Sequence, residues 1–351
     1  MEVQRCPIFN SELSKNPVLT RRVQFFLFLS IAEGTKKTYR SKLRQFAEFC
    51  VKEDYNPPLP LKEDTLCFYA AYRLKTVKYK TFKGDLSALR SWHIDMGLHW
   101  VVSKMRILER VARGGRRFRG DSSLTDEKQR ITVKKLEKML LFLDPTDPVY
   151  ATLRAAFCTA TLGLLRCGEF ALSGASEFAK WKLPKESDVK MFPNWNKPSR
   201  MEIVIRASKA DPFRRTVTVA IGATVANVDA VREVRDMLMT RWQNNPALQS
   251  DDYLFKVGDK PLTRKVIISA LDTLTKRCGF QGKFSGHSFR KGGATSLALA
   301  GCPDSFIRVM GRWSSDAYLR YIKLSAQARA RISSAMFTKD KDAFGALELF
   351  E

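Results

Sequence analysis

Apolar residues recur at helical spacing in the first third of the chain. Thr35 is the expected N-cap of a helix whose apolar residues lie three or four positions apart, at Tyr39, Leu43, Phe46 and Cys50. The segment NPPLP at 56–60 interrupts the pattern, and a second helix then ends near Leu74. A third helix is expected over 81–96. The pattern therefore predicts a small, helical N-terminal domain.

An apolar stretch precedes these helices. Residues 23–32 read VQFFLFLSIA and follow Arg21 and Arg22. The stretch is too short to cross a bilayer, and Glu33 follows it where a signal peptide would have small residues at a cleavage site. We therefore expect a buried N-terminal helix or arm. No run of about 18 apolar residues occurs, so no membrane-spanning helix and no membrane partner are expected.

The second half of the chain combines helical and strand patterns. Residues 201–209 and 214–221 are β-branched and alternate in polarity, and Asp211 and Pro212 mark the turn between them, so they predict a β-hairpin. Helical patterns surround it in ITVKKLEKMLLFL, DPVYATLRAAFCTATLGLLR, ANVDAVREVRDMLMTRW, LTRKVIISALDTLTKRC and the chain from Phe289 onward. The predicted fold class is mostly α with a small β-sheet: a helical domain joined to an α+β domain.

A basic stretch separates the two halves. The segment KMRILERVARGGRRFRG at 104–120 has seven basic residues, one acidic residue and three glycines. We interpret it as a domain boundary or linker that lies along a phosphate backbone. A short basic run also occurs in nuclear-import signals, although the bare pattern is weak.

The charge of the chain points to its partner. Lysine and arginine number 61 against 36 acidic residues, which gives a formal net charge of +25. A large anionic partner is therefore expected, and nucleic acid is the first candidate. The alternative is a ribosomal-type or merely soluble basic protein. The seven cysteines are scattered without a CxxC pair, so we expect reduced thiols in an intracellular compartment and no metal site.

Two cations in the second half are candidates for chemistry. Arg166 ends the apolar run TLGLLR, with Glu169 three residues later. A charge that leaves so apolar a run needs a partner, and an internal ion pair with Glu169 is the alternative to a substrate-binding role. Lys209 ends the first strand of the hairpin, where a solvated surface charge is the ordinary alternative.

The segment SGHSFRKGG at 285–293 contains one of only three histidines in the chain. His287 and Arg290 are three positions apart, so at a helix start they face the same way. The free N–H groups of such a start attract phosphate, whereas a structural histidine is the alternative. Three aromatic residues follow in MGRWSSDAYLRYIK, where packing is the alternative role: Trp313, Tyr318 and Tyr321.

The order Arg, Lys, His-x-x-Arg, Trp and Tyr resembles the active-site set of the tyrosine recombinase (phage-integrase-like) family over roughly residues 35 to 335. GHSFRKGGAT and GRWSSDAYLRYI are most similar to its eukaryotic branch in Crypton transposons and in DIRS- and Ngaro-type retroelements. The resemblance implies an N-terminal arm or helix (1–33), a helical, SAM-like core-binding domain (34–112), a basic linker (113–130), an α+β catalytic domain (131–337) and a tail (338–351).

The resemblance also implies a role for each site residue. Arg166 and Arg290 would grip the scissile phosphate, and Lys209 would protonate the departing 5′ oxygen. His287 matches the first position of the family's HxxR box. Glu169 would hold the residues that contact the phosphate without contacting it itself. Trp313 falls where the family has histidine or tryptophan, and Tyr321 matches the nucleophile. Tyr321 follows Trp313 by eight residues, one fewer than in many members, so Tyr318, five residues after Trp313, is the alternative nucleophile.

The function implied is a DNA recombinase or transposase of a mobile element. It would cut and rejoin strands through a covalent 3′-phosphotyrosine and a Holliday junction, without metal or cofactor. A type IB-like DNA-relaxing enzyme and a host-captured, non-catalytic DNA-binding protein are the alternatives. The implied partners are double-stranded DNA and further copies of the chain, as a dimer on one site and a tetramer in synapsis. In a eukaryotic host the location would be the nucleus.

Two further sets of residues are expected at interfaces. The first is basic and would contact DNA: Lys36, Lys37, Arg40, Arg44, Arg113, Arg116, Arg117 and Arg119. The second lies in the amphipathic tail and would dock on a neighbouring copy, a disordered tail being the alternative: Phe344, Leu347, Leu349 and Phe350.

Overall fold

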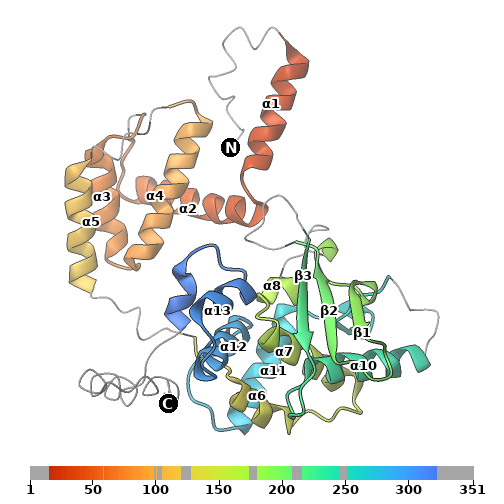
Figure 1. The fold of residues 1–351 in the computed structure, drawn as a ribbon. Coiled ribbons are helices and arrows are strands. Elements are labelled where there is room, and N and C mark those ends of the chain that lie inside the picture. The colour runs from red at the N-terminus through yellow and green to blue at the C-terminus, as the bar shows by residue number, and fades with distance from the viewer. Residues whose placement is uncertain are drawn as a thin grey trace. The chain divides into compact units, whose positions relative to one another are not determined.

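The computed structural model describes residues 16–57, 59–98, 100, 105–119, 128–173, 180–207, 216–244 and 251–321. The chain divides into two compact units, Met1–Asp126 and Glu127–Glu351, here called unit 1 and unit 2 (Figure 1). Unit 1 is helical, and unit 2 combines helices with a small sheet. The observed class agrees with the mostly α fold with a small β-sheet that the sequence predicts.

Unit 1 consists of helices around an apolar core. The helices are α1 (Pro17–Ser30), α2 (Glu33–Lys52), α3 (Glu63–Leu74), α4 (Tyr79–Asp95) and α5 (Arg106–Arg119). Aromatic rings of α2, α3 and α4 fill the core, with Tyr69 in contact with Phe46, Phe49 and Phe82. The three helices predicted from apolar spacing are therefore confirmed, although α2 begins at Glu33 with Ala32 rather than Thr35 as its N-cap.

A buried carboxylate ties three helices of unit 1 together. Asp85 of α4 is almost fully buried and lies 2.5 Å from Lys42 Nζ of α2 and 3.0 Å from Arg73 Nε of α3. Removing one partner of such a group leaves an uncompensated buried charge, which costs several kcal/mol. The network therefore fixes how α2, α3 and α4 pack.

His93 is a structural histidine inside unit 1. The Leu61 backbone N–H donates to its Nε2 at 3.0 Å, so the proton is on Nδ1, which donates to the Leu89 carbonyl at 2.8 Å. Burial lowers the pKa of the ring, because the charged form would lose its hydration. This histidine packs and caps, and takes no part in the predicted chemistry.

The expected N-terminal helix is present, but the expectation that it is buried is wrong. The apolar stretch does form helix α1, but none of its residues is buried, and Phe25, Phe26 and Phe28 are all more than half exposed. Lys36 Nζ of α2 lies 3.0 Å from the centre of the Phe28 ring. Within the described residues, no helix is long and apolar enough to cross a membrane.

The interpretation of 104–120 as a linker is also wrong for residues 106–119. They form α5, which packs against α3 and buries Leu108 and Ala112. Gly115 lies so close to α3 that a Cβ there would be 2.5 Å from Leu74 Cδ1. The glycine therefore permits a close helix contact here, whereas the sequence pattern suggested that it ends regular structure.

Unit 2 packs helices against one face of a three-stranded sheet (Figure 1). Strands β1 (Val189–Phe192), β2 (Arg200–Ile205) and β3 (Val217–Gly222) are antiparallel in the order β1-β2-β3, and Ile205 pairs with Val217. The predicted hairpin is confirmed as β2 and β3, while the short β1 was not predicted. The turn with Asp211 and Pro212 lies outside the described residues. A second small sheet pairs β4 (Lys256–Val257) with β5 (Lys260–Pro261).

Most helical segments of unit 2 follow the predicted patterns, whereas the short ones at 167–170 and 186–188 were not predicted. The segments are α6 (Val133–Leu140), α7 (Pro148–Leu162), α8 (Cys167–Phe170), the 3-10 helix η5 (Glu186–Asp188), α10 (Ala230–Asn244), α11 (Arg264–Arg277), α12 (His287–Leu299), α13 (Asp304–Met310) and the 3-10 helix η7 (Asp316–Tyr321).

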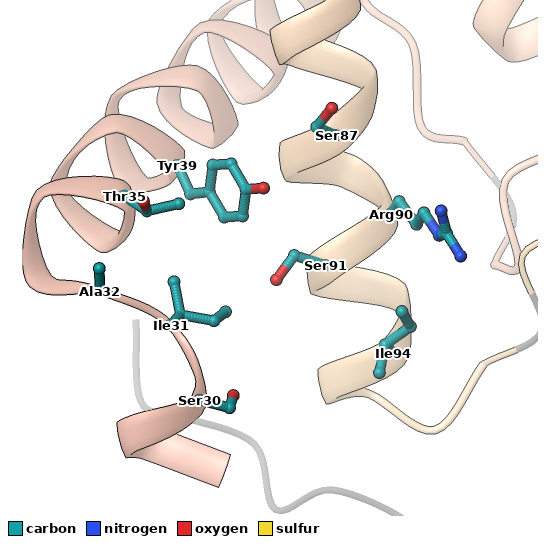
Figure 2. A pocket seen from close by; sticks show the side chains of 9 residues that line it. All are labelled: Ser30, Ile31, Ala32, Thr35, Tyr39, Ser87, Arg90, Ser91 and Ile94. Carbon is teal, nitrogen blue, oxygen red and sulfur yellow. The ribbon is translucent and has the colours of Figure 1, made fainter. Parts of the chain in front are cut away.

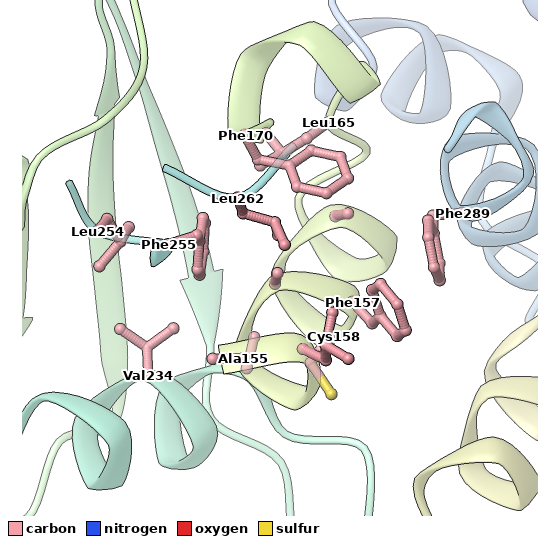
Figure 3. Close-up of a cluster of buried hydrophobic side chains, with 14 of the residues drawn as sticks. Ala155, Phe157, Cys158, Leu165, Phe170, Val234, Leu254, Phe255, Leu262 and Phe289 are labelled. Carbon is pink, nitrogen blue, oxygen red and sulfur yellow. The ribbon is translucent and has the colours of Figure 1, made fainter. Parts of the chain in front are cut away.

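Helix α7 runs through the core of unit 2, as Figure 3 shows around Phe157. The Phe157 ring stacks on Phe289 of α12 with centroids 4.5 Å apart. Gly293 lets α12 approach α7 this closely, because a Cβ there would lie 2.2 Å from the Thr161 carbonyl oxygen. Part of the glycine-rich segment 285–293 therefore serves packing.

Candidate functional site

Helix α7 ends in a turn that presents Arg166. Leu164, with φ of 48°, lies in the left-handed region, and Arg166 becomes the N-cap of α8. The Arg166 backbone N–H donates to Glu169 Oε2, and its Nη1 donates to Glu169 Oε1, both at 2.9 Å. Glu169 is buried, while the Arg166 side chain is 20% exposed. The ion pair that was the alternative to a substrate-binding role therefore exists, and the Arg166 side chain remains partly accessible.

The start of α12 lies against the start of α8. A Cβ at Gly286 would be only 2.4 Å from Cys167 Sγ, so the glycine lets the two segments meet. His287 is the first residue of α12 and is exposed, and its backbone N–H donates to Ser285 Oγ at 3.3 Å. The fold thus brings the segments that carry Arg166 and His287 together, although more than a hundred residues separate them.

Arg290 lies one turn after His287 and is completely buried. Its Nη1 donates to the Leu164 carbonyl and its Nη2 to the Gly311 carbonyl. The Trp313 ring covers it, with Arg290 Cζ 4.1 Å from the ring centroid, a cation–π contact. A Cβ at Gly311 would overlap this ring, at 1.6 Å from its Cζ3 atom. Glycine is therefore required at 311 for Trp313 to lie over Arg290.

The two candidate nucleophiles differ in what the structure shows of them. Tyr318 is only 7% exposed and packs in an apolar cluster with Leu164, Ala294, Ala298 and Ile307. Its ring centroid is 5.9 Å from that of Trp313. Tyr321 is the last residue of η7, and its side chain is outside the described structure, as is all of Lys209. Aromatic packing accounts for Tyr318.

The structure adds one residue that the sequence reasoning missed. Arg312 Nη2 donates to Glu169 Oε2 at 2.8 Å, so Glu169 is shared between Arg312 and Arg166. Arg312 Nη2 also lies 3.4 Å from the Leu164 carbonyl that Arg290 binds. The sequence did offer a signal for Arg312, because it is a basic residue directly before Trp313. Only the aromatic residues of this segment were considered as candidates.

The basic residues expected to bind DNA lie on α2 and α5 of unit 1. Lys37, Arg40 and Arg44 are exposed on α2, and Lys36 is half-buried beside Phe28. Arg113, Arg116 and Arg117 are exposed on α5, whereas the side chain of Arg119 is outside the described structure. Both helices therefore present cations to solvent.

A pocket of about 430 Å³ lies beside the start of α2. Figure 2 shows the Tyr39 side chain directed from α2 toward α4, where Ser87, Ser91 and Arg90 line the other side. The hydroxyl groups of the two serines make this wall polar, whereas the Arg90 side chain is directed away from Tyr39 (Figure 2). Among the described residues, no group of three His, Cys, Asp or Glu side chains gathers as candidate metal ligands.

Comparison with known proteins gives a family for part of the chain. The phage integrase family matches residues 204–327. No curated protein sequence matches the chain.

Several solved structures share its fold. XerH site-specific recombinase bound to its palindromic difH substrate is 16% identical over 86% of this chain and 80% of that chain, with a TM-score of 0.60. The Tn1549 transposon integrase in complex with circular intermediate DNA is 18% identical over 87% and 94%, with a TM-score of 0.53. The lambda integrase dimer bound to a core site is 14% identical over 86% and 75%, with a TM-score of 0.51. The phage integrase family thus matches residues 204–327, and the chain shares its fold with these solved recombinases and integrases.

Proposed function

We propose that this protein is a site-specific tyrosine recombinase of a mobile element. One observation carries the proposal: Arg166, Glu169, Arg290 and Trp313, which come from three separate segments, meet in one cationic cluster of unit 2. Convergent guanidinium groups are the means by which proteins bind and stabilise a reacting phosphate. The net charge of +25 suits a DNA substrate.

In the proposed reaction Tyr321 attacks a backbone phosphorus. The bond from the phenolic oxygen to phosphorus forms as the bond from phosphorus to the 5′ oxygen breaks, and Lys209 gives that oxygen a proton. A free tyrosine has a pKa near 10, so only about one in a thousand is ionised at pH 7. The phenolic proton passes to water before the attack, and the arginine cluster stabilises the resulting phenolate and the charge that develops on phosphorus. The phosphotyrosine ester retains the energy of the broken bond, so the reverse attack by a DNA hydroxyl rejoins the strand.

The two family arginines play different parts in this proposal. Arg166 is partly exposed and meets the phosphate directly. Arg290 is fully buried with both terminal nitrogens on backbone carbonyls, so it can touch a phosphate oxygen only after its surroundings rearrange. In this proposal His287, which is exposed at the start of α12, donates to the same phosphate.

The proposal extends to binding and assembly. The exposed cations of α2 and α5 hold the DNA backbone, with a dimer on one site and a tetramer in synapsis. An origin in the Crypton, DIRS or Ngaro group, with a nuclear location, follows from the similarity of GHSFRKGGAT and GRWSSDAYLRYI to that branch.

A trapping experiment tests the function. Duplexes that bind the full chain are recovered from a random pool, and the bound sequence is then rebuilt with a nick beside each candidate cleavage point. A nicked strand loses its short end after cleavage, so a covalent adduct accumulates and migrates as one band. We expect that adduct with EDTA present, and peptide mapping should place it on Tyr321. A bound duplex that never yields an adduct at any nick position would refute the recombinase proposal.

A further inference from the structure

Arg312 is held in the arginine cluster by several contacts. Its Nη2 donates to Glu169 Oε2 at 2.8 Å, and its Nη1 lies 3.3 Å from the Gly163 carbonyl. Arg166 Nη2 in turn lies 3.4 Å from the Arg312 carbonyl. The two guanidinium groups therefore occupy the two oxygens of one buried carboxylate, which places them side by side.

The backbone at Arg312 is in a conformation that arginine seldom adopts. Its φ is 53°, in the left-handed region that glycine enters without cost. Non-glycine residues in this region cost about 1 kcal/mol or more and cluster at functional sites. Leu164, whose carbonyl both Arg290 and Arg312 approach, has φ of 48°. Two left-handed residues thus shape the same cluster.

Arg312 is also accessible. Its side chain is 15% exposed and that of Arg166 is 20% exposed, whereas Arg290 is fully buried. The contacts of Arg312 with the Gly163, Met310 and Leu164 carbonyls are long, at 3.3 to 3.4 Å, so its guanidinium can exchange one of them for a phosphate oxygen.

Charge favours a third arginine. Arg166, Arg290 and Arg312 together with Glu169 have a formal charge of +2, whereas the same set without Arg312 has +1. A phosphodiester attacked by a phenolate carries a charge of about −2 at phosphorus and its ligands, since each reactant contributes one negative charge. The extra guanidinium raises the positive charge that these four side chains bring to the reacting centre.

We propose that Arg312 is a catalytic residue of the recombinase site, which binds a non-bridging oxygen of the scissile phosphate beside Arg166. Glu169 holds both guanidinium groups in place. Tyr321 follows Arg312 by nine residues, the spacing between histidine or tryptophan and the nucleophile in many members of the family, whereas it follows Trp313 by eight. Trp313 then serves to cover Arg290. This inference rests on the proposed recombinase function.

The first test removes the Arg312 charge. Arg312→Gln should slow adduct formation on the nicked duplex about 100-fold or more, the usual cost of one lost charge-stabilising donor. DNA binding should change by less than about threefold, because many other cations contact the backbone. Arg277→Gln, at the far end of α11 and exposed, is the matched control for the loss of one positive charge and should leave the rate unchanged. Arg312→Lys, which keeps a charge beside Glu169, should fall between the two and serves in place of Arg312→Gln if that variant unfolds.

The second test separates phosphate contact from support of Glu169. In a methylphosphonate a methyl group replaces one non-bridging oxygen, so the linkage is neutral. The ratio of the cleavage rate of the unchanged protein to that of Arg312→Gln should be at least tenfold smaller on one or both methylphosphonate stereoisomers than on the phosphate. In a Glu169→Gln background no carboxylate needs neutralising, yet Arg312→Gln should still slow cleavage of the phosphate. An equal loss on all linkages, or no loss in the Glu169→Gln background, would show that Arg312 only balances Glu169.

The outcomes distinguish the two proposals. If the unchanged protein forms no adduct on any bound duplex, the recombinase function fails. If it forms the adduct and Arg312→Gln forms it equally fast, the function stands and the role of Arg312 is refuted.

Discussion

The guanidinium of Arg290 lies beneath the indole of Trp313, with Arg290 Cζ 4.1 Å from the ring centroid. A buried charge needs compensation, and here two backbone carbonyls and an aromatic face supply it. The arrangement stabilises the fold around α12 and at the same time shields a guanidinium that the proposed reaction uses. The pair therefore links stability to activity, and substitutions at Trp313 should affect both.

Trp313→Ala should destabilise unit 2 by about 2 kcal/mol, since it removes a half-buried ring and a cation–π contact. Trp313→Phe keeps an aromatic face over Arg290 and should lose less than half as much. Urea unfolding of the full chain measures the change. Trp181→Ala is the control, because Trp181 is 44% exposed and should cost less than about 0.5 kcal/mol. Equal effects at the two tryptophans would mean that the contact with Arg290 adds nothing.

Tyr318 and Tyr321 should separate cleanly by substitution with phenylalanine. Tyr321→Phe removes the attacking hydroxyl and should abolish the covalent adduct on a nicked duplex. Tyr318→Phe keeps the ring that packs among Leu164, Ala294 and Ile307, so the adduct should form at a rate within about threefold of the unchanged protein. Gel electrophoresis after heating in detergent measures the covalent adduct that each variant forms. An adduct that survives Tyr321→Phe and vanishes with Tyr318→Phe would reassign the nucleophile.

Two adjacent glycines should respond oppositely to alanine if α5 packs as described. Gly114 has nothing within 4 Å of a built Cβ, so Gly114→Ala should stabilise unit 1 by roughly 0.5–1 kcal/mol through helix propensity. Gly115 faces Leu74 at 2.5 Å, so Gly115→Ala should destabilise it by more than about 1 kcal/mol. Hydrogen exchange of α3 and α5 peptides reports the difference. No effect from either change would instead fit a linker at 104–120.

Unit 1 should lose stability in mild acid because of His93. Burial lowers the pKa of its ring, so the unfolded chain binds the proton more readily than the folded one. The stability that a neutral His93 contributes is complete above the unfolded pKa of about 6.5 and declines as the pH falls below it. Calorimetry between pH 7.5 and pH 5 should show this decline, and His93→Gln should flatten it. An unchanged slope in the variant would assign the decline to other groups.

The sequence by itself determined several elements, one ion pair and the sign of the net charge. Apolar spacing was sufficient for α2, α3 and α4, and alternation of β-branched residues was sufficient for β2 and β3, because periodicity reports directly on which side of an element is buried. The spacing of Arg166 and Glu169 indicated their ion pair, since residues three positions apart at a helix start are neighbours. The net charge of +25 by itself indicated a polyanionic partner, because charge is a property of composition and does not depend on the fold.

Tertiary structure decided what contacts between distant segments produce. The burial of Arg290 depends on carbonyls at Leu164 and Gly311, and the place of Arg312 depends on a carboxylate 143 residues earlier in the chain. Gly115 permits a helix contact rather than ending a helix, because Leu74 lies against it. No local pattern encodes such partners. They arise only when α7, α8, α12 and α13, or α3 and α5, are packed together, since close packing determines which side chain lies against which.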